Sequence, residues 1–214
     1  MSIRPSSPVN GVHSGVTIFS KARCATCLGW SFGRASLKVV RFFSTLNLME
    51  VLTLGNGLLK QKSEKVEKID EETAEIIRKM FEAMKRDKGV GLAAPQVGIM
   101  KRIFVTLVEG DAERVFINPS ILETSVKTTK YEEGCLSVPG IYANVVRAQS
   151  VKVQAWNEKG RPFTMETDGL LARVILHECD HLEGVVFLDH LPEQKRNKLF
   201  EKYEKKRSKE QAAE

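Results

Sequence analysis

Two histidines one helical turn apart carry the strongest chemical signal in this sequence. Residues 177–181 read HECDH, so four positions separate His177 from His181, and Glu178 follows the first histidine. On an α-helix, side chains four residues apart share a face, which lets two imidazoles bind one metal ion. Glu178 then lies beside the open coordination position, where a carboxylate can act as a general base. The spacing predicts a metal-dependent hydrolase.

A purely structural role for these histidines is the alternative. Leu170, Val174, His177 and His181 follow one another at spacings of four, three and four, so the histidines continue the core-facing stripe of a predicted helix. One histidine on such a stripe is usually a hydrogen-bonded core residue. Two of them with a glutamate between favour a metal site.

The third metal ligand decides the chemistry, because catalytic zinc-type sites commonly have three protein ligands and a water. The pattern HExxHxxGxxH would supply another histidine, but Phe187 stands at that position. Glu201, His190 and Cys135 remain as candidates. Lysines surround Glu201 and predict a solvent-facing residue, and His190 has the features of a surface or hydrogen-bonded residue. Cys135 lies in a glycine-containing turn and is favoured, although a single cysteine is often only a small buried residue.

Helix signals mark three segments that must position these residues. The first begins at Asp70, a good N-cap, has Glu71 and Glu72 in its first turn, and ends before Gly89. The second covers about residues 168–182 and carries the histidines. The third lies beyond residue 192 and is polar and basic, with a narrow apolar seam formed by Leu199, Phe200 and Tyr203.

Strand-like segments lie between the first two helices. They cover residues 103–108, 114–118, 121–131, 151–156 and 162–167, and residues 50–54 are also strand-like. Short strands in succession followed by one late helix predict an α+β fold. We expect antiparallel or mixed β-sheets packed around a central metal-binding helix, with one helix on its N-terminal side and another at the C-terminus.

Residues 1–48 form a leader that we expect to lie outside the fold as a disordered segment. They hold six basic residues and no acidic residue. This composition suits an organelle transit peptide, whereas Met49 followed by a strand-like segment resembles a natural chain start and favours a mis-assigned extension. Cys24 and Cys27 have CxxC spacing, but no second pair follows to complete a zinc ribbon. We expect a bacterial cytoplasmic protein, or a mitochondrial or plastid one if the leader is a transit peptide.

The remaining chain divides into a catalytic domain, residues 49–191, and a basic C-terminal helix and tail, residues 192–214. Residues 49–214 hold 27 basic and 27 acidic groups, which argues against DNA binding despite the formal charge of +6. No apolar run is long enough to span a bilayer, and four cysteines are too few for a disulfide framework. The basic tail is best interpreted as a solvated helix; contact with ribosomal RNA is the weaker alternative.

Three segments together resemble the ordered motifs of the peptide deformylase family. Residues 89–96 read GVGLAAPQ, residues 133–137 read EGCLS, and residues 177–181 read HECDH. The resemblance covers about residues 49–191 and is to the bacterial and organellar branch with a helical C-terminus. Leu176 departs from it, since many members carry glutamine before the first ligand histidine.

The resemblance implies removal of the formyl group from the N-terminal formyl-methionine of new polypeptides, with release of formate. Metal-bound water would attack the formyl carbonyl, with Glu178 as general base and acid. The side-chain amide of Gln96 and the backbone N–H of Leu136 match the donors that stabilise the oxyanion. The implied metal ligands are Cys135, His177 and His181. Fe²⁺ is the expected native metal, and Zn²⁺, Ni²⁺ or Co²⁺ can occupy such a site.

The resemblance also implies where the nascent peptide binds. It would lie extended along Val90, Gly91 and Gly140 as an added strand. The apolar pocket for its methionine would include Val90, Leu170, Val174 and the aliphatic part of Arg173. Two interpretations of Arg147 have equal weight. Its side chain could contact the end of the substrate, or it could form a salt bridge that holds the sheet. Cys179 projects away from the ligand face and is expected to pack in the core.

Two other functions are alternatives to peptide deformylation. The first is a metalloprotease in which Glu201 is the third ligand. The second is a structural metal site in a ribosome- or RNA-associated module, motivated by the basic tail. Structural zinc sites usually close all four positions with protein ligands, and the sequence offers only three good ones.

Overall fold

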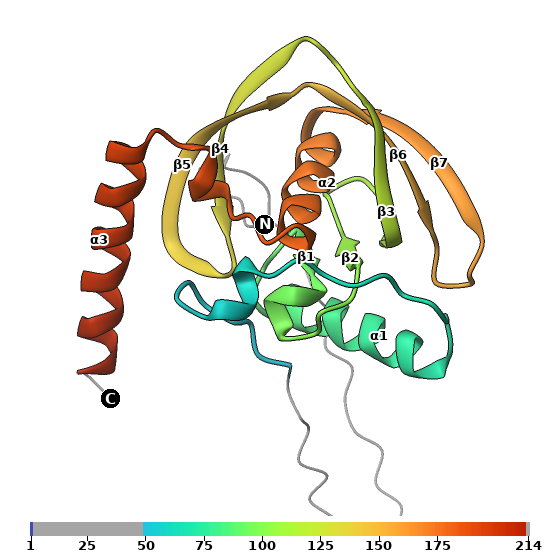
Figure 1. Cartoon of the computed structure of the whole chain (residues 1–214), viewed down its shortest axis with the longest axis horizontal. Helices are drawn as coiled ribbons and strands as arrows, with labels where there is room; N and C mark the ends of the chain where they lie inside the picture. The colour runs from blue at the N-terminus through green and yellow to red at the C-terminus, as the bar shows by residue number, and fades with distance from the viewer. Residues whose placement is uncertain (2–48, 213–214) are drawn as a thin grey trace, which may run out of the picture. The chain divides into compact units, whose positions relative to one another are not determined.

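The computed structural model describes Met1 and residues 49–212. Two antiparallel sheets form its framework (Figure 1). The first has five strands in the order β1 (Gly91–Ala93), β2 (Ile103–Thr106), β3 (Arg114–Thr124), β6 (Ser150–Trp156) and β7 (Pro162–Asp168). The second is a hairpin of β4 (Thr128–Cys135) and β5 (Val138–Ala148). The predicted α+β class is confirmed, and the strands of both sheets pair antiparallel.

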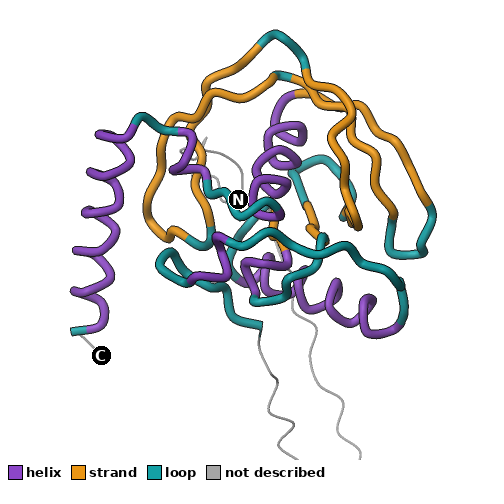
Figure 2. Tube along the Cα trace, viewed as in Figure 1, coloured by secondary structure: helices purple, strands orange, loops and turns teal. Residues whose placement is uncertain are grey.

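Helix α2 (Gly169–Leu182) lies at the centre, and the long strands arch over it (Figure 2). It contacts strands of both sheets. Ala172 and Ile175 are fully buried in a cluster with Phe104 of the five-stranded sheet, while the histidine stripe belongs to another side of the helix. A helix buried on several sides is fixed by packing in its rotation as well as its position.

Helix α1 (Glu71–Arg86) forms as the sequence predicts. The Asp70 side chain caps it by accepting a hydrogen bond from the backbone N–H of Thr73 at 3.2 Å. Met80 and Met84 of its apolar stripe are fully buried in the cluster that contains Leu92 of β1, and Ile76 and Phe81 are partly buried against it. Burial of this face holds β1 in place at the edge of the sheet.

Helix α3 (Glu193–Gln211) lies beside β5 (Figure 1). Tyr203 is buried and Leu199 packs against the same cluster, but Phe200 is 44% exposed. The apolar seam is therefore narrower than predicted. In the part of the chain that the structure describes, no helix is both long enough and apolar enough to cross a bilayer.

Two strand predictions were wrong, and two strands were not predicted. Residues 121–131 are not one strand, because the chain changes sheet at residues 125–127, where the Ser125 hydroxyl donates to the Lys127 carbonyl at 2.7 Å. Residues 50–54 form no strand; Leu52 and Leu54 each donate one backbone hydrogen bond, to two separate segments. Strands β1 and β5 were not predicted, since each contains or adjoins glycine and proline, which weaken the strand signal.

Candidate metal centre

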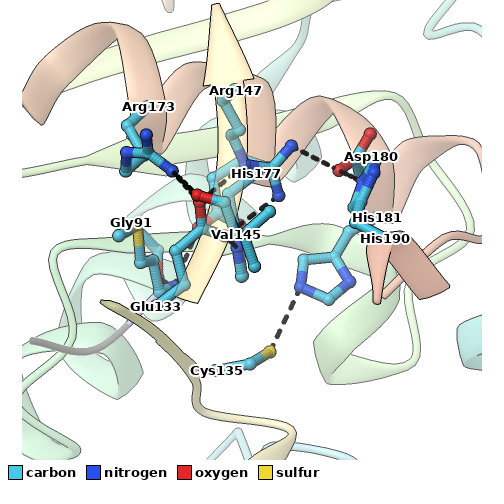
Figure 3. A network of polar contacts seen from close by, with 12 residues as sticks. Gly91, Glu133, Cys135, Val145, Arg147, Arg173, His177, Asp180, His181 and His190 are labelled. Carbon is cyan, nitrogen blue, oxygen red and sulfur yellow. Dashed lines mark hydrogen bonds and ion pairs between the residues drawn. The ribbon is translucent and has the colours of Figure 1, made fainter. Parts of the chain in front are cut away.

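Three side chains with metal-binding atoms meet at the centre of the fold. Cys135 ends β4, and His177 and His181 lie one turn apart on α2. All three are buried, and their ligand atoms lie within 4.8 Å of one another. The Cys135 sulfur is 3.2 Å from Nε2 of His181 (Figure 3). Folding thus joins the hairpin to the central helix at one small cluster.

The donor atoms of this cluster fit a divalent metal. Nδ1 of His177 is 2.9 Å from the Glu133 carboxylate, and its Nε2 is buried without a hydrogen-bond partner among the described residues. Burial alone would raise the pKa of the Cys135 thiol, but the imidazoles of His181 and His177 outweigh it and hold that pKa well below its usual range. A thiolate and two imidazoles suit several transition metals and leave room for water.

Gln96 points its amide into the same space. Its side-chain oxygen accepts a hydrogen bond from the Ala93 N–H at 2.9 Å, which fixes the amide orientation. Its Nε2 donates to the Ser137 hydroxyl at 3.1 Å and lies 3.4 Å from the Cys135 sulfur. Leu136 occupies the turn between β4 and β5, directly after Cys135. Both predicted oxyanion donors therefore lie next to the metal-binding cluster.

The amino-terminal methionine lies in this site. The amine of Met1 donates to the Gly91 carbonyl at 2.7 Å and to Oε1 of Glu178 at 2.9 Å. The Val90 N–H donates to the Met1 carbonyl at 2.9 Å. This corrects the expectation that the whole leader lies outside the fold, because Met1 is completely buried. The other leader residues, including Cys24 and Cys27, fall outside the described part of the chain.

An apolar pocket encloses the Met1 side chain. Val108 and Val174 are buried with it, and Val90, Leu170 and Leu171 pack around the cluster. Of the residues predicted to bind substrate, Val90, Gly91, Leu170 and Val174 are thus brought to a methionine. The pocket offers apolar contact to the side chain, and the polar contacts go to the backbone and the amine.

Glu178 has one occupied and one free oxygen. Oε1 receives the Met1 amine, whereas Oε2 is buried without a hydrogen-bond partner in the described part of the structure. Burial by itself would raise the pKa of Glu178, but the Met1 amine and the two neighbouring imidazoles together lower it. The carboxylate is therefore ionised near neutral pH and can accept a proton at the free oxygen.

Comparison with known protein families identifies the family of this chain. Residues 48–197 match the family model described as "Polypeptide deformylase". The chain belongs to this deformylase family. The resemblance carried by the three sequence motifs, and the enzyme class that it implies, are confirmed.

Individual deformylases agree with this result over most of their length. The chain is 48% identical to the peptide deformylase of Neisseria meningitidis serogroup C (strain FAM18) over 161 residues, which cover 74% of this chain and 96% of the relative. A crystal structure of a peptide deformylase from Legionella pneumophila superposes with a TM-score of 0.74 at 38% identity, covering 78% of this chain and 99% of the other. A crystal structure of a peptide deformylase from Synechococcus elongatus in complex with actinonin gives a TM-score of 0.70 at 42% identity, covering 72% of this chain and 85% of the other.

A buried ion-pair network supports the first histidine of this deformylase chain. Glu133 accepts hydrogen bonds from Arg147 at 2.7 and 3.0 Å and from Arg173 at 2.6 Å, and it holds His177 on the other side (Figure 3). Burial would raise the pKa of Glu133, but His177 and Arg147 outweigh it and lower that pKa. The supporting role of Glu133 was not predicted from the sequence, although Glu133 stands two positions before the cysteine.

The remaining predicted residues have definite places. Arg147 also donates to Asp180 at 2.7 Å, so its guanidinium is occupied by ion pairs, which supports the salt-bridge reading. Arg173 directs its guanidinium to Glu133 and to the Thr129 carbonyl at 2.8 Å. Gly140 is exposed and lies beside Lys206 of α3. Its contact with substrate stays a prediction.

Two other candidates for the third ligand, Glu201 and His190, do not belong to the metal-binding cluster, and neither does Cys179, which was expected to pack in the core. Glu201 is exposed on α3. His190 is exposed and its Nε2 lies 2.7 Å from Asp180. Burial, with the charge of Asp180 adding to it, raises the pKa of Cys179 to about 12, so this thiol stays protonated at neutral pH. Cys179 packs against the sheet cluster instead.

Proposed function

We propose that the chain removes the formyl group from the N-terminal formyl-methionine of newly synthesised polypeptides and releases formate. One observation carries the proposal. The carboxylate of Glu178 lies 2.9 Å from the amine of a terminal methionine, directly beside a Cys–His–His cluster. The leaving group of deformylation is the amine of a terminal methionine, so the Glu178 carboxylate is placed where it can return a proton to such an amine.

Cys135, His177 and His181 are the residues that would hold the metal. Bound there, the metal supplies Lewis-acid activation of a water molecule near neutral pH. The thiolate and two imidazoles suit Fe²⁺, Zn²⁺, Ni²⁺ and Co²⁺. We propose Fe²⁺ as the native metal because the family resemblance favours iron. Elemental analysis of protein purified without oxygen tests this assignment, and stoichiometric zinc under those conditions would contradict it.

Glu178 carries the proton through the reaction. Its free oxygen accepts a proton as water attacks the formyl carbon, and the bond between that carbon and the amine nitrogen then breaks. The same carboxylate returns the proton to the leaving nitrogen, which lies at hydrogen-bond distance from Oε1. Formate and the free amine are the products.

Gln96 and Leu136 stabilise the negative oxygen that develops on the formyl carbon. The Gln96 amide is held by Ala93 and Ser137 before substrate binds, so little reorganisation is needed. The Leu136 N–H is the second donor. By comparison with other oxyanion holes, each donor contributes about 3 kcal/mol to stabilisation of the transition state.

The peptide binds by extending the five-stranded sheet. Strand β1 is an edge strand, since it pairs only with β2 among the strands of the described sheet. Val90 and Gly91 offer one donor and one acceptor on the free side, and Met1 uses both. A nascent peptide can do the same, with its methionine side chain in the pocket of Val90, Leu170 and Val174.

Release of formate from a formyl-Met-Ala-Ser peptide tests the proposal. The metal-loaded protein should release formate, and Glu178→Ala should abolish release while metal content stays at one ion per chain. Glu201→Gln is the control and should retain full activity, because Glu201 is exposed on α3. Loss of activity in Glu201→Gln would favour the metalloprotease reading, and no release by the unmodified chain would refute deformylation.

The basic face of α3 is a proposed contact with the ribosome. Five exposed lysines, Lys198, Lys202, Lys205, Lys206 and Lys209, share this helix. Lysine clusters bind phosphate backbones with an affinity that falls with salt. Replacing Lys198, Lys202 and Lys209 by glutamate should abolish co-sedimentation with ribosomes at low salt and leave peptide deformylation unchanged. Undiminished co-sedimentation would contradict this contact.

The cellular location also stays a proposal. We propose a bacterial cytoplasmic protein, with a mitochondrion or plastid as the alternative if residues 1–48 are a transit peptide. Mass spectrometry of the native N-terminus distinguishes the two. A chain beginning at Met49 would support mis-assigned initiation, and a cleaved end before Met49 would support import.

A further inference from the structure

One short segment of chain holds both proposed oxyanion donors. The backbone N–H of Leu52 donates to the Gln96 carbonyl at 2.6 Å, and the backbone N–H of Leu54 donates to the Ser137 carbonyl at 2.8 Å. Ser137 directly follows Leu136, whose N–H is the second donor. This segment belongs to no helix or strand. Its backbone nevertheless connects the two halves of the site.

A side-chain hydrogen bond closes the arrangement into a ring. Nε2 of Gln96 donates to the Ser137 hydroxyl at 3.1 Å, and both residues are completely buried. A buried carbonyl keeps its hydrogen bond because no water is at hand to replace the donor. A shift of Leu52 and Leu54 would therefore move both oxyanion donors together.

Arg207 of α3 holds the segment from outside. Its Nη1 donates to the Leu54 carbonyl at 3.2 Å, and its Nη2 donates to the Glu204 carboxylate at 2.8 Å. Its guanidinium carbon lies 5.9 Å from the centre of the Tyr203 ring. Tyr203 and Leu54 are buried in the same apolar cluster as Cys135. The Arg207 side chain is thus fixed by α3 and in turn fixes the carbonyl of Leu54.

We propose that Arg207 is a positioning residue, which holds Gln96 and Leu136 in place through Leu52 and Leu54. This inference rests on the proposed deformylase function. A guanidinium is suited to this role, because a hydrogen bond from a charged donor is stronger than one from a neutral donor. Arg207 acts on the orientation of the donors and not on the substrate.

The position of the two donors matters because they act only on the transition state. An oxyanion donor must lie about 2.7–3.1 Å from the oxygen that becomes negative, and loss of one donor lowers kcat by about 100-fold or more. Loosening both donors should have a smaller effect of the same kind. We expect kcat and kcat/KM to fall together while KM stays constant.

Arg207→Met removes the hydrogen-bond donor and keeps an apolar side chain over Tyr203. We expect kcat for formyl-Met-Ala-Ser to fall by about 3- to 10-fold with unchanged KM and metal content, a fraction of the effect of a missing donor. Arg207→Lys keeps a charged donor for the Leu54 carbonyl and should recover most of the activity. Arg196→Met is the matched control on α3 and should behave like the parent, because its side chain forms no hydrogen bond or ion pair with another described residue.

A double-mutant cycle with Gln96 separates positioning from a general loss of stability. Arg207→Met should lower kcat less in the Gln96→Ala background than in the parent, because one of the two donors that it positions is already missing. The same factor in both backgrounds would overturn the inference, since Arg207 would then act independently of the oxyanion donors.

Amide hydrogen exchange gives a test that needs no turnover. Arg207→Met should make exchange of the Leu52 and Leu54 amides several-fold faster and leave the amides of α1 unchanged. Formate release with parent-like exchange at these two amides would refute the role of Arg207 and leave deformylation established. Faster exchange without formate release by the metal-loaded parent would refute deformylation but not the hold of Arg207 on this segment.

Discussion

At the scale of single residues, the two described cysteines show how surroundings decide chemistry. Cys135 lies against two imidazoles, which lower the pKa of its thiol in spite of burial. Cys179 lies near the carboxylates of Asp180 and Glu178, which add to the effect of burial and raise the pKa of its thiol. A metal needs the thiolate form, so only Cys135 is suited to be a ligand.

Serine substitutions separate these two cysteines. Cys135→Ser should lose both the metal and the activity, because a neutral hydroxyl is a poor ligand. Cys179→Ser should keep stoichiometric metal and nearly full activity, with a modest loss of stability from the polar atom in a packed region. Metal content and formate release measure both effects. Equal loss in the two variants would show that the thiolate ligand is misassigned.

Glu133 is predicted to act through His177. Glu133→Gln removes the charge that orients this imidazole and pairs with Arg147 and Arg173. We expect metal affinity to fall by about 10- to 100-fold, measured by competition with a chelator. Breaking the buried ion pairs should also cost about 3 kcal/mol or more in the free energy of unfolding.

A surface carboxylate provides the control for Glu133. Glu123→Gln removes an ion pair with Lys152, but Glu123 is 69% exposed, so the metal affinity and the free energy of unfolding should stay near those of the parent.

The stability that the Glu133 carboxylate contributes should depend on pH. It should be present above the ordinary glutamate pKa of about 4.3. It should be lost as the pH falls toward the lower pKa of the folded state. Parent-like metal affinity in Glu133→Gln would contradict the orienting role.

At the scale of elements, β1 and α2 approach each other closely because Gly91 lacks a side chain. A methyl group at Gly91 would lie 2.8 Å from Val174 and would overlap the Glu178 carboxylate. The absence of a side chain therefore lets the helix place its catalytic carboxylate against the strand that binds the peptide. This is why the glycine-rich segment and the HECDH helix must be read together.

Alanine at Gly91 should displace Glu178 and damage catalysis. We expect kcat/KM to fall by about 100-fold or more, since misplacement by roughly 1 Å can have that effect. Gly57→Ala is the matched control, because a methyl group there would meet no atom within 4 Å. Formate release and thermal unfolding of both variants provide the comparison. Unchanged kcat/KM in Gly91→Ala would refute the close-packing argument.

At the scale of the whole molecule, the metal would add a further link between the β4–β5 hairpin and helix α2, which ion pairs of Glu133 and Arg147 already join. Cys135 belongs to the β4–β5 hairpin, and the two histidines belong to the helix that packs on the five-stranded sheet. A ligand that binds only the folded state stabilises it by mass action. Metal binding should therefore stabilise the entire catalytic domain.

Removal of the metal by a chelator should lower Tm. At a free metal concentration of 100 times Kd, binding contributes about 2.7 kcal/mol, which corresponds to a shift of roughly 5 to 10 °C for a domain of this size. Differential scanning calorimetry with and without metal measures the shift. Cys135→Ser should show no metal-dependent change, and an equal shift in that variant would place the metal elsewhere.

The sequence by itself determined the chemistry and the class of fold. The spacing of His177 and His181, the cysteine in its glycine-containing turn and the three ordered motifs were enough to predict a metal-dependent deformylase. Asp70 and the apolar stripe of the first helix predicted its limits, because capping and helical periodicity are local properties. Local signals failed at β1 and β5, whose strands form through pairing with partners distant in the sequence.

Only the tertiary structure decided how these residues act together. The support of His177 by Glu133, the close approach of Gly91 to Glu178 and the burial of Met1 each join residues far apart in the chain. Sequence spacing carries no information about such contacts, because they arise when separate elements are packed into one core. The sequence thus identifies the reactive groups, while packing sets their protonation and orientation.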